Sequence, residues 1–178
     1  MKILKWILIV LVSLVVIVLV TALFVDGNIA AEKQITINRP KSEVFAYIKM
    51  LGNQNSFSSW AMQDPEMKKE FRGTDGTVGF VSAWDGEKMG KGEQEITKIT
   101  EGERIDYELR FIKPFESTNL AYMTTQDAQD NQTTVKWGFS GKMNYPMNIM
   151  KLFGNMDETI GQDFQIGLEN LKTNLESK

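Results

Sequence analysis

The chain has 178 residues, a formal net charge of −3 at pH 7, and neither cysteine nor histidine. Disulfides, thiolate nucleophiles, Ser-His and Cys-His catalysis and most zinc sites are therefore excluded. The charged residues form no basic run and no cluster with metal-ligand spacing, so we expect no nucleic-acid partner, no metal and no cofactor.

An apolar segment lies near the start of the chain. No charged residue interrupts the stretch from Trp6 to Val25. About 20 apolar residues are needed for a helix to cross a bilayer, so residues 6–25 predict a transmembrane helix. A cleavable signal peptide is the alternative, although its apolar region is usually about 7–15 residues long.

The charges around this segment predict its orientation. Lys2 and Lys5 precede it, whereas Asp26 and Glu32 follow it. By the positive-inside rule the N-terminus is cytoplasmic, and the rest of the chain lies on the outer side of the membrane, periplasmic or extracellular. We expect a single-pass anchor over residues 1–25, a linker over 26–32 and one domain over 33–178.

A strand and a helix open this domain. Residues 31–40 alternate, with Ile35 and Ile37 on one face, which is typical of a half-buried strand. Residues 40–51 predict a helix, because Pro40 suits a first helical turn and the apolar side chains after it recur at helical spacing.

About six further strands follow, separated by turn signals. In one of them Tyr107 and Phe111 share a face and Glu108 lies on the other; in the last, Trp137 and Phe139 share a face. Such alternation predicts an antiparallel sheet with one apolar face that another element must cover.

One long helix is predicted over residues 148–172. At about 100° per residue its apolar side chains form a single stripe, which is expected to pack on the sheet. The stripe consists of Ile149, Leu152, Phe153, Met156, Ile160, Phe164, Leu168, Leu171 and Leu175. The fold class is therefore α+β, with a curved sheet around this helix.

Three glycines interrupt the stripe, and each costs a helix roughly 0.5–1 kcal/mol relative to alanine. Gly154 is interpreted as a bend or the helix start, and Gly167 as a close approach to the sheet. For Gly161 two interpretations stay open: it leaves room for a ligand, or it accommodates a side chain.

The pattern resembles the polyketide cyclase/dehydrase-like proteins of the START-related superfamily, which share the fold of the birch pollen allergen. The resemblance rests on "ITINRPKSEVFAYI", "GTVGFVSAWDGEKMGKGEQEIT", "TTVKWGFSG" and "DETIGQDFQIGLENLK". It implies a helix-grip fold: seven antiparallel strands around a long C-terminal helix, with a hydrophobic cavity between them. Many relatives bind lipids or other apolar molecules there.

The apolar faces would line such a cavity, although each of these residues alone is better explained as core packing. The predicted ligand-binding residues are Phe80, Trp84, Tyr107, Phe111, Tyr122, Trp137, Phe139, Met156, Ile160, Gly161 and Phe164. The mouth is expected at residues 53–60, 114–116 and 145–153.

Binding of a hydrophobic small molecule or lipid by a membrane-tethered domain is the first functional hypothesis. The second is a cyclase, dehydratase or hydrolase acting on an apolar substrate, with Asp157 as the candidate base because it lies at the edge of the helix stripe. A protein-interaction module of the cell envelope with a solid core is the third. Glu93 and Glu95 are expected to face solvent, as are Asp106 and Glu108.

Overall fold

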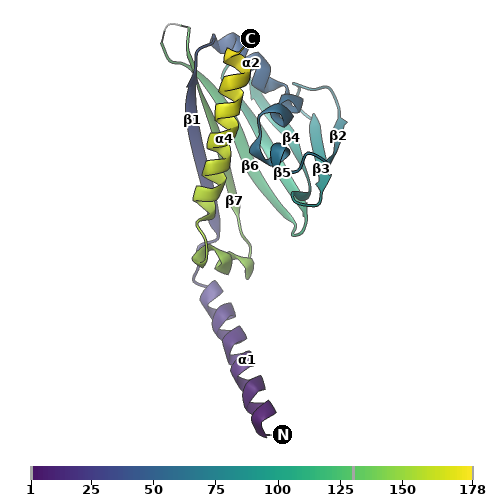
Figure 1. The fold of residues 1–178 in the computed structure, drawn as a ribbon, viewed down its shortest axis with the longest axis vertical. Helices are drawn as coiled ribbons and strands as arrows, with labels where there is room; N and C mark the ends of the chain where they lie inside the picture. Colours follow the sequence, from purple (N-terminus) through teal and green to yellow (C-terminus); the bar gives the residue numbers. More distant parts are fainter. Residues whose placement is uncertain (1, 130, 178) are drawn as a thin grey trace.

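The computed structural model describes residues 2–129 and 131–177. One helix, α1 (Lys2–Ala22), projects from an α+β domain that contains a seven-stranded antiparallel sheet and a long C-terminal helix (Figure 1). The strands are β1 (Asn28–Ile37), β2 (Lys68–Arg72), β3 (Val81–Gly86), β4 (Gly90–Thr100), β5 (Arg104–Lys113), β6 (Ser117–Asp127) and β7 (Thr133–Lys142). The predicted fold class is confirmed.

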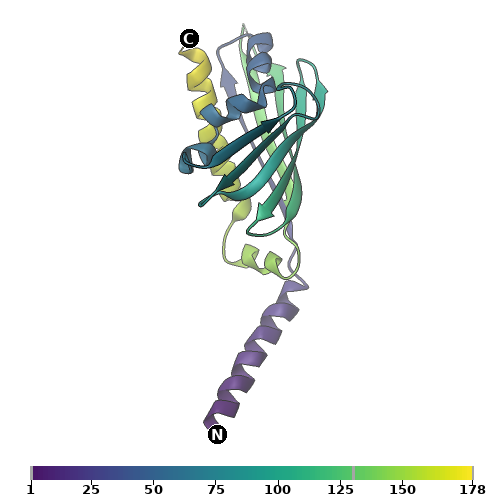
Figure 2. The ribbon, with the colours of Figure 1, turned by 90° about the vertical axis from the view of Figure 1, so that its right-hand side faces the viewer.

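The sheet has the order β1-β7-β6-β5-β4-β3-β2, so every consecutive pair from β2 to β7 is a hairpin. β1 is the exception, because it pairs antiparallel with the last strand, Asn28 opposite Lys142 and Ile37 opposite Thr133. The sheet is strongly twisted and curved (Figure 2). The helices cover its concave face (Figure 2).

Two groups of helices cover this concave face. The long helix α4 (Met156–Glu176) packs along β1 and β7, while α2 (Lys41–Lys49), η1 (Leu51–Ser56) and α3 (Ser59–Gln63) lie between β1 and β2 in the chain and cover the other half of the sheet (Figure 1). A short 3₁₀ helix, η2 (Met147–Leu152), connects β7 to α4 at the end of the domain where α1 joins.

The core forms where α4 meets the inner side chains of the strands. Trp137 of β7 stacks on Phe164 of α4, with 4.7 Å between ring centroids, and meets Phe57 and Trp60 edge-on at 5.7 and 6.0 Å. A Cβ on Gly167 would come within 2.9 Å of the Trp137 ring. Gly167 therefore allows the close helix–sheet approach that was predicted for it.

The predicted long helix is wrong in its first third. α4 begins at Met156, and the side chain of Asn155 caps it by accepting a hydrogen bond from the Glu158 backbone N–H at 3.2 Å. Gly154 lies in the break between η2 and α4. As a result Leu152 and Phe153 do not extend the apolar stripe onto the core but are exposed to solvent.

The segment expected as a linker over residues 26–32 is largely part of the sheet. β1 begins at Asn28, and the Gly27 carbonyl accepts a hydrogen bond from the Met143 N–H at 2.8 Å. The side chain of Asn148, in η2, donates hydrogen bonds to the carbonyls of Ala22 at 2.7 Å and Val25 at 2.8 Å. We refer to these contacts as the joint, because they fasten the end of α1 to the domain.

The convex face of the sheet carries charged side chains. Arg110 forms ion pairs with Glu93 and Glu95, both at 2.7 Å, and with Glu108. These three carboxylates face outward as predicted. Hydrogen bonds from Arg110 and Arg72 outweigh desolvation and hold the pKa of Glu93 below its usual value.

Candidate functional site

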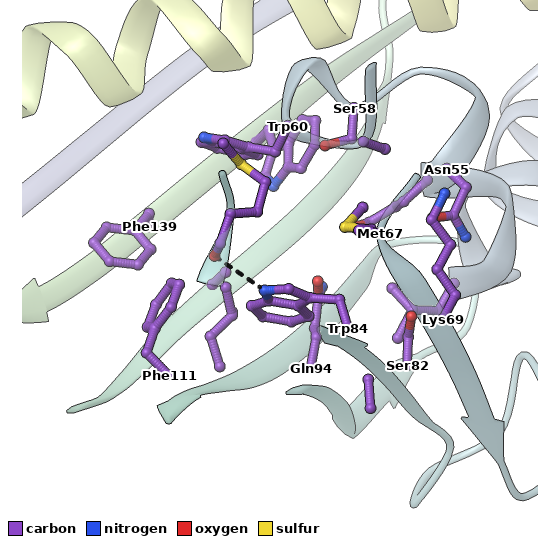
Figure 3. A pocket seen from close by; sticks show the side chains of 18 of the residues that line it. Asn55, Ser58, Trp60, Met67, Lys69, Ser82, Trp84, Gln94, Phe111 and Phe139 are labelled. Carbon is purple, nitrogen blue, oxygen red and sulfur yellow. Dashed lines mark hydrogen bonds between the residues drawn. The ribbon is translucent and has the colours of Figure 1, made fainter. Parts of the chain in front are cut away.

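A cavity of about 250 Å³ lies between the concave face of the sheet and the helices α4, η1 and α3. Its lining is mostly apolar, with polar side chains at one end (Figure 3). The lining residues are Leu51, Gln54, Asn55, Ser58, Trp60, Ala61, Met67, Lys69, Ser82, Ala83, Trp84, Met89, Gln94, Leu109, Phe111, Ala121, Trp137, Phe139, Ile160 and Phe164. We call this cavity the pocket.

Aromatic rings form one end of the pocket. Phe111 near the end of β5 and Trp84 of β3 meet edge-on at 5.9 Å, and Phe139 of β7 lies beside Phe111 in Figure 3. Ile160, in the second turn of α4, adds an aliphatic side chain. These residues can bury a hydrocarbon chain or ring and so remove its surface from water.

The opposite end of the pocket is polar. Ser82 of β3 lies directly opposite Gln94 of β4, while Ser58 precedes α3 and Lys69 belongs to the edge strand β2. In the part of the chain that the structure describes, these four side chains form no hydrogen bond with another residue. Their donors and acceptors are therefore available to a ligand or to water in the pocket.

Six of the residues predicted to bind a ligand do line the pocket. They come from three strands and from α4, which explains why the sequence does not place them close together. They are Trp84, Phe111, Trp137, Phe139, Ile160 and Phe164. Trp137 and Phe164 also belong to the core, so their rings form the floor of the pocket.

Three other predicted residues are placed elsewhere. Phe80 is buried and stacks on Phe71 at 5.9 Å, and Met156 is the first residue of α4; neither lines the pocket. Tyr107 is fully buried in the core, where burial raises the pKa of its hydroxyl well above the ordinary value. The neighbouring side chain of Gln54 offsets a part of this rise.

Tyr122 lies on the convex face of the sheet, so its prediction as a pocket residue is wrong. Its hydroxyl donates to the carboxylate of Glu32, and Arg104 lies 4.0 Å above its ring. The ring occupies the space beside Gly138, since a Cβ there would come within 2.3 Å of it. Because the hydroxyl hydrogen bond stabilises the carboxylate, it lowers the pKa of Glu32.

Gly161 does not border the pocket either. A Cβ on Gly161 would lie 2.9 Å from Cε of Lys33, which is on the inner face of β1. Of the two interpretations left open for Gly161, the structure supports contact with a side chain. The ligand-binding role predicted for Gly161 has no geometric basis.

Asp157 has a structural contact instead of a place in the pocket. Its Oδ1 accepts the backbone N–H of Ala30 at 3.1 Å. β1 is an edge strand, so this N–H points away from the sheet and would otherwise be without a protein partner. Asp157 therefore connects the first turn of α4 to the free edge of β1. It does not line the pocket, where a catalytic base would have to lie.

One of the three segments expected to form the mouth lines the pocket. Asn55, Ser58 and Trp60 border the pocket, whereas no described residue of 114–116 or 145–153 does so. Sequence reasoning also missed the polar pair Ser82 and Gln94. The alternation of residues 92–96, with Glu93 and Glu95 facing outward, would have placed Gln94 on the inner face.

Comparisons with solved structures show the same fold. Norcoclaurine synthase from Thalictrum flavum superposes with a TM-score of 0.63 at 8% identity, covering 85% of this chain and 95% of its own. The protein Ara h 8.0201 has a TM-score of 0.59 at 15% identity, and the match covers 85% of this chain and 100% of that one. A protein from Chromobacterium violaceum has a TM-score of 0.58 at 14% identity, covering 83% and 96%.

The sequence comparisons agree with the fold. No curated protein matches the chain. Residues 28–176, which begin with the first residue of β1 and end with the last residue of α4, match the family described as polyketide cyclase / dehydrase and lipid transport. This chain belongs to that family.

Proposed function

We propose that the chain is a membrane-tethered binding protein that holds a hydrophobic small molecule, or one chain of a lipid, in the pocket. The observation that carries the proposal is the pocket itself: aromatic at one end, polar at the other, and placed between the sheet and α4. Small-molecule sites are commonly concave and apolar with a few polar groups that orient the ligand.

The size of the pocket narrows the ligand class. Its volume of about 250 Å³ is close to the lower end of the roughly 300–1,000 Å³ found for small-molecule sites. A compact ring system or a single acyl chain fits this volume better than a lipid with two long chains. The polar end favours a ligand that also carries a hydrogen-bonding group.

α1 supports the tether. It is 21 residues long, it carries no charged residue after Lys5, and its apolar stretch is not buried against the domain. At 1.5 Å per residue its length is about 30 Å, which is the thickness of a bilayer core. A signal sequence passes the same test, but the joint favours retention, because the domain uses the end of α1 as a packing partner.

The other two hypotheses have less support. Among the described lining residues Lys69 is the sole ionisable side chain, and Asp157 lies outside the pocket. An acid–base enzyme would therefore lack the carboxylate on which that hypothesis depends. An interaction module would need no cavity, whereas this domain has one with unsatisfied polar groups.

Photo-crosslinking of the full chain in lipid nanodiscs tests the proposal. A fatty acid with a diazirine in its chain is added, the sample is irradiated, and the modified peptides are identified by mass spectrometry. We expect adducts in β5, β7 and the first turns of α4, in addition to α1. Adducts confined to α1 and to exposed residues would show that the pocket does not bind an acyl chain.

Gln94→Leu tests the polar end of the pocket. Removal of one hydrogen bond is worth about 0.5–1.5 kcal/mol, so we expect a fatty acid to bind a few-fold to roughly tenfold more weakly while a hydrocarbon probe without polar groups binds at least as well. Titration with the two ligands measures this difference. The matched control is Gln126→Leu on the exposed end of β6, which should change neither affinity.

A further inference from the structure

An exposed apolar surface lies at the end of the domain where α1 joins. It is formed by the segment after α1 and by the segment from β7 to α4, and its most exposed members are Phe24 at 84% and Phe153 at 85%. We call it the base surface, and it consists of Leu23, Phe24, Tyr145, Met150, Leu152 and Phe153. None of these residues borders the pocket.

The joint fixes the base surface relative to α1. Asn148, the second residue of η2, donates to the carbonyls of Ala22 and Val25, and Lys151 donates to the carbonyl of Asn28. η2 is thus held against the end of α1 and the start of β1, which lie on either side of the connecting residues 23–27. When α1 spans a bilayer core of about 30 Å, Ala22 lies at its outer boundary and the base surface at the level of the headgroups.

The amino-acid composition of the base surface is typical of protein segments that lie among lipid headgroups. Aromatic side chains are enriched at membrane–water interfaces, where Tyr145 can keep its hydroxyl in water while its ring is in the lipid. Asp26, which follows Phe24 closely in the chain, lies near Lys151 and Lys142, and both lysines are attracted by anionic headgroups. In water the exposed rings would instead form an unfavourable apolar patch.

We propose that the base surface inserts into the headgroup–acyl boundary of the membrane that α1 crosses, and so holds the domain upright on the bilayer. The inference rests on the proposed tether. The insertion is a further property, because a tether alone would leave the domain free to tilt in water. Phe111 and Ile160, at the aromatic end of the pocket, belong to the ends of β5 and α4 that are nearest this surface (Figure 1).

Site-directed spin labelling of the full chain in nanodiscs with anionic lipid tests the insertion. The chain contains no cysteine, so single labels can be placed by Val12→Cys in α1, Phe153→Cys or Leu152→Cys in the base surface, and Ile166→Cys. Ile166 is 49% exposed on the solvent face of α4 and is the matched control. The readout is the collision rate of each label with oxygen, which concentrates in lipid, and with a nickel complex that stays in water.

We expect the labels at 12, 152 and 153 to collide with oxygen and to lose collisions with nickel, relative to the label at 166. If the label at 12 is in lipid while those at 152 and 153 match the label at 166, the base surface is not inserted but the tether stands. If the label at 12 is in water, the tether is wrong and the inference falls with it.

Discussion

Replacement of Trp137 by alanine is expected to lower the free energy of unfolding by about 3–5 kcal/mol, the range for a tryptophan or phenylalanine truncated in a core. Trp137 is buried and contacts three aromatic rings, those of Phe57, Trp60 and Phe164. The truncation would leave each of them beside a void and would remove the ring that packs against Gly167. Urea unfolding of the full chain in detergent, followed by circular dichroism, measures the change.

Trp84→Ala is the matched control for this prediction. Trp84 also lines the pocket, but it is half-buried, and among the described residues its one aromatic neighbour is Phe111, so the space it leaves stays open to water. We expect a loss of no more than about 2 kcal/mol, within the range of ordinary single substitutions. Equal losses for Trp84→Ala and Trp137→Ala would contradict the assignment of Trp137 to the core.

Ile160→Trp is expected to weaken the binding of an acyl chain at least tenfold, a change of about 1.4 kcal/mol in binding free energy. Ile160 is half-buried at the aromatic end of the pocket, and a larger ring there would occupy space that the ligand needs. Because it lies in the second turn of α4 and not in the fully buried core, we expect the fold to tolerate the ring. Titration of a fluorescent fatty acid measures the affinity.

The control for Ile160→Trp is the same substitution at Ile166, on the solvent face of the same helix. Ile166→Trp should leave both the affinity and the melting temperature unchanged. Normal binding by Ile160→Trp, in a variant that melts like the original chain, would show that the ligand does not use this pocket. Loss of binding together with loss of the circular dichroism signal would show that the fold does not tolerate the ring.

Much of the fold could be predicted because the strands alternate clearly. Tyr107 and Phe111 on β5, and Trp137 and Phe139 on β7, face inward as their spacing predicts, since apolar side chains on one face must be buried. The start of α4 could not be located in this way. The apolar spacing continues through η2, and the signals of a new helix are Gly154, interpreted as a bend or the helix start, and Asn155, which caps α4.

The pocket was harder to predict than the fold. β6 carries apolar residues on both faces, Leu120 and Tyr122 outward and Ala121 and Met123 inward, so alternation alone does not tell which face is buried. The role of Gly161 depends on a single contact, with Lys33, and a lysine is not expected on an inner face. Which face of β6 is buried, and what contacts Gly161, depend on side chains that are distant in the sequence. The periodicity of a single segment therefore does not predict them.

The pairing of β1 with β7 has a consequence for the order in which the domain is completed. β1 follows α1 directly in the chain, yet its partner in the sheet is the last strand to be synthesised. Contacts between residues so far apart form slowly and only after both have emerged from the ribosome. We therefore expect the end of the domain next to α1 to be made first and completed last. A chain stalled before Thr133 would leave β1 and the edge of β6 unpaired.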